Sequence, residues 1–345
     1  MISKPAQLVR RLPLPLSFPF PTTLGDKVNR LLVLGALALA PLTASASCGS
    51  AFCTINTSWD AHGAWLEPGA RFDLRYESIR QDQPRTGTRD LRVGEIPHHH
   101  DEVLTVNRNL LGSVDYTFNQ DWGVNVLVPI VDRHHDHIHN HGGAQLPESW
   151  DFTELGDVRV MARRRLTTTE NRDAPAIATS GINFGLKLPT GKTNVQNADG
   201  DLAERSLQPG SGTTDAVFGA YYSTHLPTRN LSWFVQALAQ LPFNTYQEYR
   251  PGNRFNLDVG GRYELGDKVG LLLQLNAQFK ARDRGEQAEP DDTGGKFLFL
   301  SPGVSYALSR QFQAYGFVQL PLHQDVNGVQ LVARHAVAVG LNMRF

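Results

Sequence analysis

The chain has 345 residues, enough for one large domain or two modest ones. Its 33 Lys and Arg residues balance 34 Asp and Glu residues, which argues against a basic nucleic-acid surface and a nucleic-acid partner. A hydrophobic fraction of 41% excludes a disordered chain, and the single long apolar run excludes a polytopic helical membrane protein. A soluble globular protein and a β-barrel remain, because polar lumen residues dilute the lipid-facing residues of a barrel.

An export signal is predicted at the N-terminus. Basic residues precede the apolar run LLVLGALALAPL at 31–42, and the small residues ASA follow at 44–46. This order is typical of a secretory signal peptide, so we expect residues 1–46 to be leader and signal, with cleavage after Ala46. The run is too short for a membrane-spanning helix, which needs about 20 apolar residues.

The two cysteines, Cys48 and Cys53, fall in the exported part of the chain. An even pair in an oxidising compartment suggests one small disulfide loop, and two free thiols are the alternative. Lipidation of Cys48 is disfavoured, because Ser45 stands where a lipobox has a large aliphatic residue. Residues 47–68 precede the first predicted strand, and the sequence leaves three alternatives for them: a periplasmic segment, a plug in the lumen or a loosely ordered terminus.

Alternation with a period of two dominates the rest of the chain. In the segment 71–77, charged residues at odd positions alternate with Phe, Leu and Tyr at even positions, and 254–265 and 271–280 repeat the design. Period two places the charged side chains on one face of a strand. These runs extend over roughly 10–13 residues, the length that a tilted strand needs to cross a bilayer.

We expect about twelve strands, and their predicted ranges are 69–79, 104–118, 122–131, 156–166, 177–188, 213–225, 231–242, 252–265, 268–280, 296–308, 311–321 and 331–345. Short links alternate with long polar links at 80–103, 132–155, 189–212, 281–295 and 322–330. The predicted fold is all-β: a transmembrane antiparallel β-barrel over residues 69–345, with short periplasmic turns and long extracellular loops. Closure leaves no edge strand exposed to lipid.

The end of the chain indicates where the barrel resides. Apolar residues alternate from Val337 to Met343, and the last residue is Phe345. A final strand that ends in an aromatic residue resembles the assembly signal of Gram-negative outer-membrane barrels. The expected location is therefore the outer membrane, and the expected partners are its lipid and, through Phe345, the barrel-assembly machinery.

Strand parity predicts a polar lumen. A charge pointed at lipid costs about 2–4 kcal/mol at the bilayer midplane, so the charged face of each strand should point inward. Such a lumen is either an ion-paired filling or a hydrophilic conduit for a small-molecule or ion solute. The predicted lumen residues are Arg71, Asp73, Arg75, Glu77, Asp157, Arg159, Arg163, Lys187, Arg254, Asp258, Arg262, Glu264 and Lys280.

Three ordered motifs carry a family resemblance: LGDV at 155–158, LKLPTGK at 186–192 and LQPGSGTTD at 207–215. Their order and spacing resemble the outer-membrane barrels grouped as the "meta-pathway of phenol degradation" family, which is similar to porin-like and fatty-acid-transporter-like barrels. The resemblance implies an outer-membrane location and passage of small molecules. It supplies no catalytic residue. Gly and Pro in these motifs are expected to set turns and strand ends.

Eight of the 12 histidines lie in two predicted outer loops, close to acidic residues. Parity in an extended segment directs His99, Asp101 and the odd-numbered histidines of the second loop toward the lumen. Imidazoles beside carboxylates suit Zn, Cu or Ni. A solvated loop without a ligand and a loop that responds to pH near about 6.5 are the alternatives. The candidate ligands are His98, His99, His100, Asp101, His134, His135, Asp136, His137, His139 and His141.

The predicted function is a transporter or channel through which a small solute diffuses along a charged lumen. No cofactor is required in this interpretation, and no enzyme activity is expected. A structural or adhesive barrel is one alternative. A surface hydrolase using Ser149, His141 and Asp151 is another, although the sequence contains no G-x-S-x-G motif.

Overall fold

The computed structural model describes residues 54–59, 62, 67–97, 100–141, 143–171 and 176–345. All of them belong to one compact unit, Ala44–Phe345, and the other unit, Met1–Thr43, lies outside the described residues. The predicted signal peptide and the predicted Cys48–Cys53 disulfide also lie outside them. Within the described ranges, no helix is both long and apolar enough to cross a membrane.

Strands make up nearly all of the regular structure. They are β1 (Gly69–Gly87), β2 (Arg89–Asp90), β3 (His100–Thr117), β4 (Trp122–His141), β5 (Ala144–Leu155), β6 (Arg159–Asn171), β7 (Ala176–Lys187), β8 (Asp215–Leu226), β9 (Leu231–Pro242), β10 (Arg254–Leu265), β11 (Val269–Lys280), β12 (Gly295–Ala307) and β13 (Phe312–Arg344). A 3-10 turn, η2 (Pro227–Arg229), links β8 to β9.

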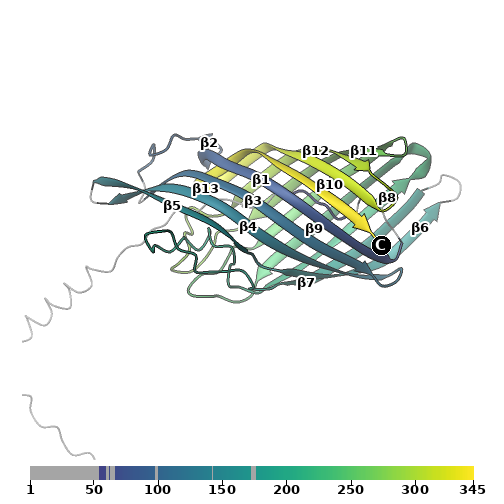
Figure 1. Ribbon diagram of the computed structural model, residues 1–345, viewed down its shortest axis with the longest axis horizontal. Helices are drawn as coiled ribbons and strands as arrows, with labels where there is room; N and C mark the ends of the chain where they lie inside the picture. The colour runs from purple at the N-terminus through teal and green to yellow at the C-terminus, as the bar shows by residue number, and fades with distance from the viewer. Residues whose placement is uncertain (1–53, 60–61, 63–66, 98–99, 142, 172–175) are drawn as a thin grey trace, which may run out of the picture. The chain divides into compact units, whose positions relative to one another are not determined.

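The sheet closes on itself as an antiparallel barrel. Eleven strands follow one another around the ring in chain order, β13 pairs with β1, and β2 and β5 lie outside the ring on β1 and β4. Figure 1 shows the first strand, in dark blue, beside the last, in yellow. Element β13 runs antiparallel to β12 up to Val326 and antiparallel to β1 from Val326 onward, so it runs along the wall once in each direction. The predicted antiparallel barrel is thus confirmed. Its ring has eleven strand elements, and because β13 contributes two segments, twelve strand segments run along the wall.

The barrel is apolar outside and polar inside. On β11, Leu271, Leu273 and Leu275 are 48%, 53% and 43% exposed, whereas Gln274 and Asn276 are fully buried. Other strands repeat this pattern, with outward apolar residues that include Leu74, Tyr76, Val114, Ile182, Phe184, Phe218, Leu257, Val259, Val304, Leu320, Val339 and Leu341. Large exposed apolar surface on a closed sheet indicates a lipid-facing belt.

Replacing Leu273 with Arg tests this belt. The residue lies near the middle of β11, so Leu273→Arg should lower the free energy of unfolding by about 2–4 kcal/mol in phospholipid vesicles. The matched change Leu308→Arg, just beyond the end of β12, should cost about 0–1 kcal/mol because that site lies near the interface. Urea titration of both variants measures the difference, and equal losses at the two sites would contradict a lipid belt centred on β11.

The strands extend further at one end than the sequence predicts. We expected a loop over 132–155, but β4 continues to His141 and pairs with β5 across the whole of it, so that prediction is wrong. The extension is stabilised by apolar packing of Val131, Trp150 and Phe152 with Leu207 of the segment that links β7 to β8. β1 likewise continues to Gly87, beyond its predicted end at 79. We call this end of the barrel the long-loop end and the opposite one the short-turn end.

Candidate functional site

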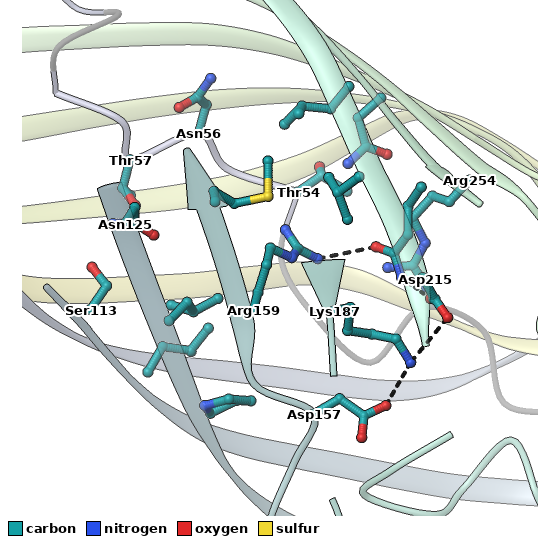
Figure 2. A pocket seen from close by; sticks show the side chains of 18 of the residues that line it. Thr54, Asn56, Thr57, Ser113, Asn125, Asp157, Arg159, Lys187, Asp215 and Arg254 are labelled. Carbon is teal, nitrogen blue, oxygen red and sulfur yellow. Dashed lines mark hydrogen bonds and ion pairs between the residues drawn. The ribbon is translucent and has the colours of Figure 1, made fainter. Parts of the chain in front are cut away.

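The interior of the barrel contains a cavity of about 440 Å³. Inward side chains of the strands, the N-terminal residues Thr54–Trp59 and the segment 188–214 form its walls. Figure 2 shows Arg159, Lys187 and Arg254 facing it from β6, β7 and β10. A solute inside the barrel would meet these charged groups.

Positive charge predominates around the cavity. The cationic side chains number nine, and they are Arg71, Arg75, Arg133, Arg159, Arg163, Lys187, Arg205, Arg254 and Lys280. The carboxylates number five, and they are Asp73, Asp115, Asp157, Asp215 and Asp258. With ordinary ionisation the lining carries an excess of about four positive charges, which favours anions over cations.

Several of these cations contact a carboxylate that they share or a neutral group. Arg71 and Arg163 share Asp115, at 3.6 and 3.5 Å. Arg159 donates from its terminal nitrogen to the neutral amide of Gln240 at 3.1 Å (Figure 2).

Two carboxylates outside the lining also contact its cations: Glu77 lies 3.1 Å from Arg75, and Asp283 lies 3.1 Å from Lys280. Counted with these two, nine cations stand against seven carboxylates, so the excess around the cavity is still positive.

Most of the residues that strand parity predicts for the lumen line the cavity. Ten of the thirteen line it: Arg71, Asp73, Arg75, Asp157, Arg159, Arg163, Lys187, Arg254, Asp258 and Lys280. Of the other three, Glu77 is buried and lies 3.1 Å from the Arg75 side chain. Arg262 and Glu264 pair with each other at 2.8 Å.

The three sequence motifs of the family resemblance meet at one edge of the cavity. Asp157 accepts hydrogen bonds from the backbone N–H groups of Gly191 and Ser211, both at 3.0 Å. Lys187 donates to Asp157 at 2.7 Å and lies 3.4 Å from Asp215 (Figure 2). The motifs therefore hold the segment 188–214 against the start of β6, the end of β7 and the start of β8, in addition to setting turns.

Two glycines permit this contact. A Cβ on Gly191 would lie 2.6 Å from the Cα of Gly210, and a Cβ on Gly210 would lie 2.3 Å from the carbonyl oxygen of Gly191. Both distances are far below van der Waals contact, so any larger residue would separate the two backbones.

The N-terminal residues 54–59 lie against the inner wall. Asn56 donates its N–H to Gln274 at 3.0 Å and accepts from the same side chain at 2.9 Å. Arg75 donates to Thr57 at 2.7 Å. Trp59 is buried against Tyr315, with ring centroids 5.2 Å apart. This segment thus occupies space inside the barrel and contributes polar groups to the cavity.

The predicted histidine ligands divide between two faces. On β4, His135 and His137 are buried, whereas His134 pairs with Asp136 at 3.0 Å and Asp151 at 3.4 Å on the other face. His139 lies 3.4 Å from Glu148 of β5. His98 and His99 lie outside the described residues, as does the side chain of His141.

The parity predicted for β3 is wrong in its first residues. An irregularity between Glu102 and Leu104 shifts the register with β4, so His100 and Glu102 share the buried face with the odd-numbered Thr105. A bulge inserts one residue and reverses the alternation beyond it. Asp101 instead accepts a hydrogen bond from Asn140 at 2.9 Å.

Sequence reasoning missed several of the residues at this end. Glu102, Glu148 and Glu204 lie beside the buried histidines, and Arg133 and Arg205 line the cavity. Odd parity continued along β4 would have found Arg133, which falls just beyond the predicted end of that strand. Glu204 and Arg205 lie in a long irregular segment, where residue spacing carries no directional signal.

A further carboxyl group lies near Glu102. Burial raises the pKa of Glu289, in the segment between β11 and β12, to about 9, and the charges of Glu102 and Asp292 add to the shift. Each neighbouring carboxylate disfavours the ionised form of the others. This corner of the long-loop end therefore favours protons or cations, in contrast to the arginine-rich cavity below it.

The alternative hydrolase triad is not assembled. The β4–β5 register places Ser149 opposite Asp136 and His141 opposite Ala144, five residues further along the strand. Five residues of strand span about 17 Å, so the register separates the backbones of Ser149 and His141 too far for a nucleophile and its base. Asp151 pairs with His134 instead.

The closed ring, the apolar outer belt and the charged interior define a transmembrane β-barrel of the outer-membrane type. The chain belongs to the family described as "putative MetA-pathway of phenol degradation", whose model matches residues 88–330. The resemblance inferred from the three motifs is thus confirmed, and so is the predicted location in the Gram-negative outer membrane.

A solved structure shows the same fold, and two others match with lower TM-scores. The COG4313 outer membrane channel from Pseudomonas putida F1 matches with a TM-score of 0.60 at 12% identity, over 84% of this chain and 100% of that chain. A Pseudomonas aeruginosa FadL homologue matches with a TM-score of 0.37 at 14% identity, over 87% and 96%. The CymD monoaromatic hydrocarbon channel matches with a TM-score of 0.40 at 9% identity, over 86% and 94%. No curated protein sequence matches the chain.

Proposed function

We propose that the barrel is a passive diffusion channel for small anionic solutes. The observation that carries this proposal is the excess of nine cationic side chains over five carboxylates around the cavity. Clusters of Arg and Lys select anions in pores because they stabilise a negative charge that has lost part of its water. Arg71, Arg159 and Arg163 all line the cavity, where a solute inside the barrel would meet their charge.

In this proposal the long-loop end faces the outside of the cell and the short-turn end faces the periplasm. Outer-membrane barrels have short periplasmic turns and longer outer loops. The pairing of Arg71 with Arg344 is consistent with this orientation, because it sets both ends of the barrel sequence at the short-turn end.

In this proposal residues Thr54–Trp59, which precede β1 in the chain, form a plug that narrows the passage. Their contacts with Gln274, Arg75 and Tyr315 also favour a second candidate, a permanently filled structural or adhesive barrel. The two candidates differ in one property, which is solute flux.

Uptake into proteoliposomes distinguishes them. Gluconate, glucose and glucosamine share a carbon skeleton and differ in charge, so their uptake rates report charge selection at similar size. We expect gluconate to enter roughly tenfold faster than glucosamine, with glucose between them, because the positive lining raises the local concentration of anions. Faster entry of glucosamine would overturn the anion channel, and no flux of any of the three would favour the filled barrel.

A further inference from the structure

We propose that His100, Glu102, His137 and Glu204 bind one divalent transition-metal ion of the Zn²⁺ class at the long-loop end. The four residues come from β3, β4 and the segment 188–214, and their donor atoms all lie within 4.8 Å of one another. His100, Glu102 and His137 are buried, and the side chain of Glu204 is only 10% exposed. A side-chain cluster that three separate chain segments build in the interior differs from a solvated histidine-rich loop.

The distances suit a single ion. Zn²⁺ holds imidazole nitrogen and carboxylate oxygen at about 2.0–2.2 Å, so the donors of a tetrahedral site lie about 3.4 Å apart. The His100 Nε2 atom lies 3.2 Å from a Glu204 oxygen and 3.8 Å from a Glu102 oxygen. The His137 Nδ1 atom lies 3.9 Å from the same Glu204 oxygen. The other donor pairs lie within 4.8 Å, so tetrahedral spacing requires shifts of up to about 1 Å.

The orientation of His137 also fits a ligand. Its Nε2 atom lies 3.0 Å from Glu148 of β5, and its Nδ1 atom lies 3.4 Å from His135 Nε2 and 3.9 Å from Glu204, so metal binding would replace the contact with His135. Metal-bound histidines commonly bond a carboxylate through the second ring nitrogen, because this holds the ring and raises its basicity. His135 lies next to the site: its Nδ1 atom is 2.9 Å from Thr105, and its Nε2 atom is 3.7 Å from Glu102.

The donor set selects the class of ion. Two imidazoles and two carboxylates suit Zn²⁺, Cu²⁺ or Ni²⁺, whereas Ca²⁺ and Mg²⁺ prefer oxygen donors alone. With neutral imidazoles the two glutamates give the cluster two negative charges, which one divalent ion balances. Charge balance matters here because buried carboxylates are costly without a compensating cation.

Such an ion would fasten the segment 188–214 to the barrel wall. Glu204 lies between Ala203, which packs in the apolar cluster around Trp150, and Arg205, which lines the cavity. An ion that bridges Glu204 to His100 and His137 would therefore hold Arg205 beside the cavity. This consequence for the passage rests on the proposed channel function, but binding of the ion does not.

Calorimetric titration of the metal-stripped full barrel with Zn²⁺ tests the site. We expect one tight equivalent in the wild type, and at least about tenfold weaker binding in Glu204→Gln and in His100→Gln, because each removes one donor. The matched control His134→Asn changes a histidine on the opposite face of β4 and should leave this affinity unchanged. Heat-modifiable gel migration of every variant verifies that it folds.

Two outcomes would overturn the site: unchanged affinity in Glu204→Gln, or an equal loss in His134→Asn, which would indicate adventitious binding by the histidine-rich surface. Hydrogen exchange tests the fastening separately. Zn²⁺ should slow amide exchange in the segment 188–214 in the wild type and leave it unchanged in Glu204→Gln. Equal exchange with and without Zn²⁺ in the wild type would overturn the fastening. Neither measurement uses solute flux, so failure here differs from failure of the channel proposal.

Discussion

Replacing Trp59 with Ala is expected to raise the conductance of the barrel in planar bilayers several-fold. Trp59 is 3% exposed and packs against Tyr315, in a cluster with Ile55, Leu272 and Phe317. Truncating a buried Trp typically costs about 3–5 kcal/mol, which shifts an equilibrium by at least about two orders of magnitude. The docked N-terminal segment should therefore leave the lumen for much of the time in Trp59→Ala.

The matched control is Ser58→Ala in the same segment. The Ser58 side chain is exposed, so its loss should leave the conductance at the wild-type value. Equal conductance in Trp59→Ala and the wild type, with both barrels folded, would show that the segment 54–59 does not limit the passage.

The second large effect is expected from reversing two cavity charges. Arg159 and Arg254 both face the cavity (Figure 2), and changing both to Glu leaves seven side chains of each sign around it. The field that favours anions should then vanish, so gluconate should lose its roughly tenfold advantage over glucosamine in proteoliposomes.

The control for this variant keeps the charge and changes the shape. The double variant Arg159→Lys and Arg254→Lys should retain the preference for gluconate, because its cavity still has nine cationic side chains. If the Glu variant kept the full preference while folding normally, selection would not depend on the charge of the cavity.

Much of the fold could be predicted because each wall strand has one lipid face and one lumen face. Side-chain exposure alternates along β11 from Leu271 to Phe279, and its predicted range differs from the observed one by a single residue. Strand β9 begins and ends as predicted, at Leu231 and Pro242. Lipid and lumen require opposite polarities on the two faces of a strand. A shift of one residue would turn every polar side chain toward lipid, so the alternation fixes which face points inward.

The prediction fails beyond the lipid belt. The residues from His134 to His137 are polar on both faces of β4, so alternation disappears although the strand continues beside β5. At the start of β3, the irregularity near Glu102 reverses the parity, and no residue type in that stretch indicates that a bulge is present. Register and bulges in such segments depend on the partner strand, which the sequence alone does not reveal.

The candidate sites follow the same division. Residues on regular strands, such as Arg159 and Arg254, could be assigned to the lumen by parity. Glu204 could not, because its position depends on the packing of Leu207 with Trp150 and Val131. Recognition of Phe345 by the assembly machinery and the disulfide between Cys48 and Cys53 stay predictions.

The central claim is that a positively charged lumen conducts small anions, and the zero-current potential tests it most directly. A planar bilayer containing the wild-type barrel is placed between two concentrations of KCl, and the voltage that stops the current is measured. The account predicts a potential with the sign of the chloride equilibrium potential, because the cavity lining has an excess of cationic side chains. A potential with the sign of the potassium equilibrium potential would contradict it.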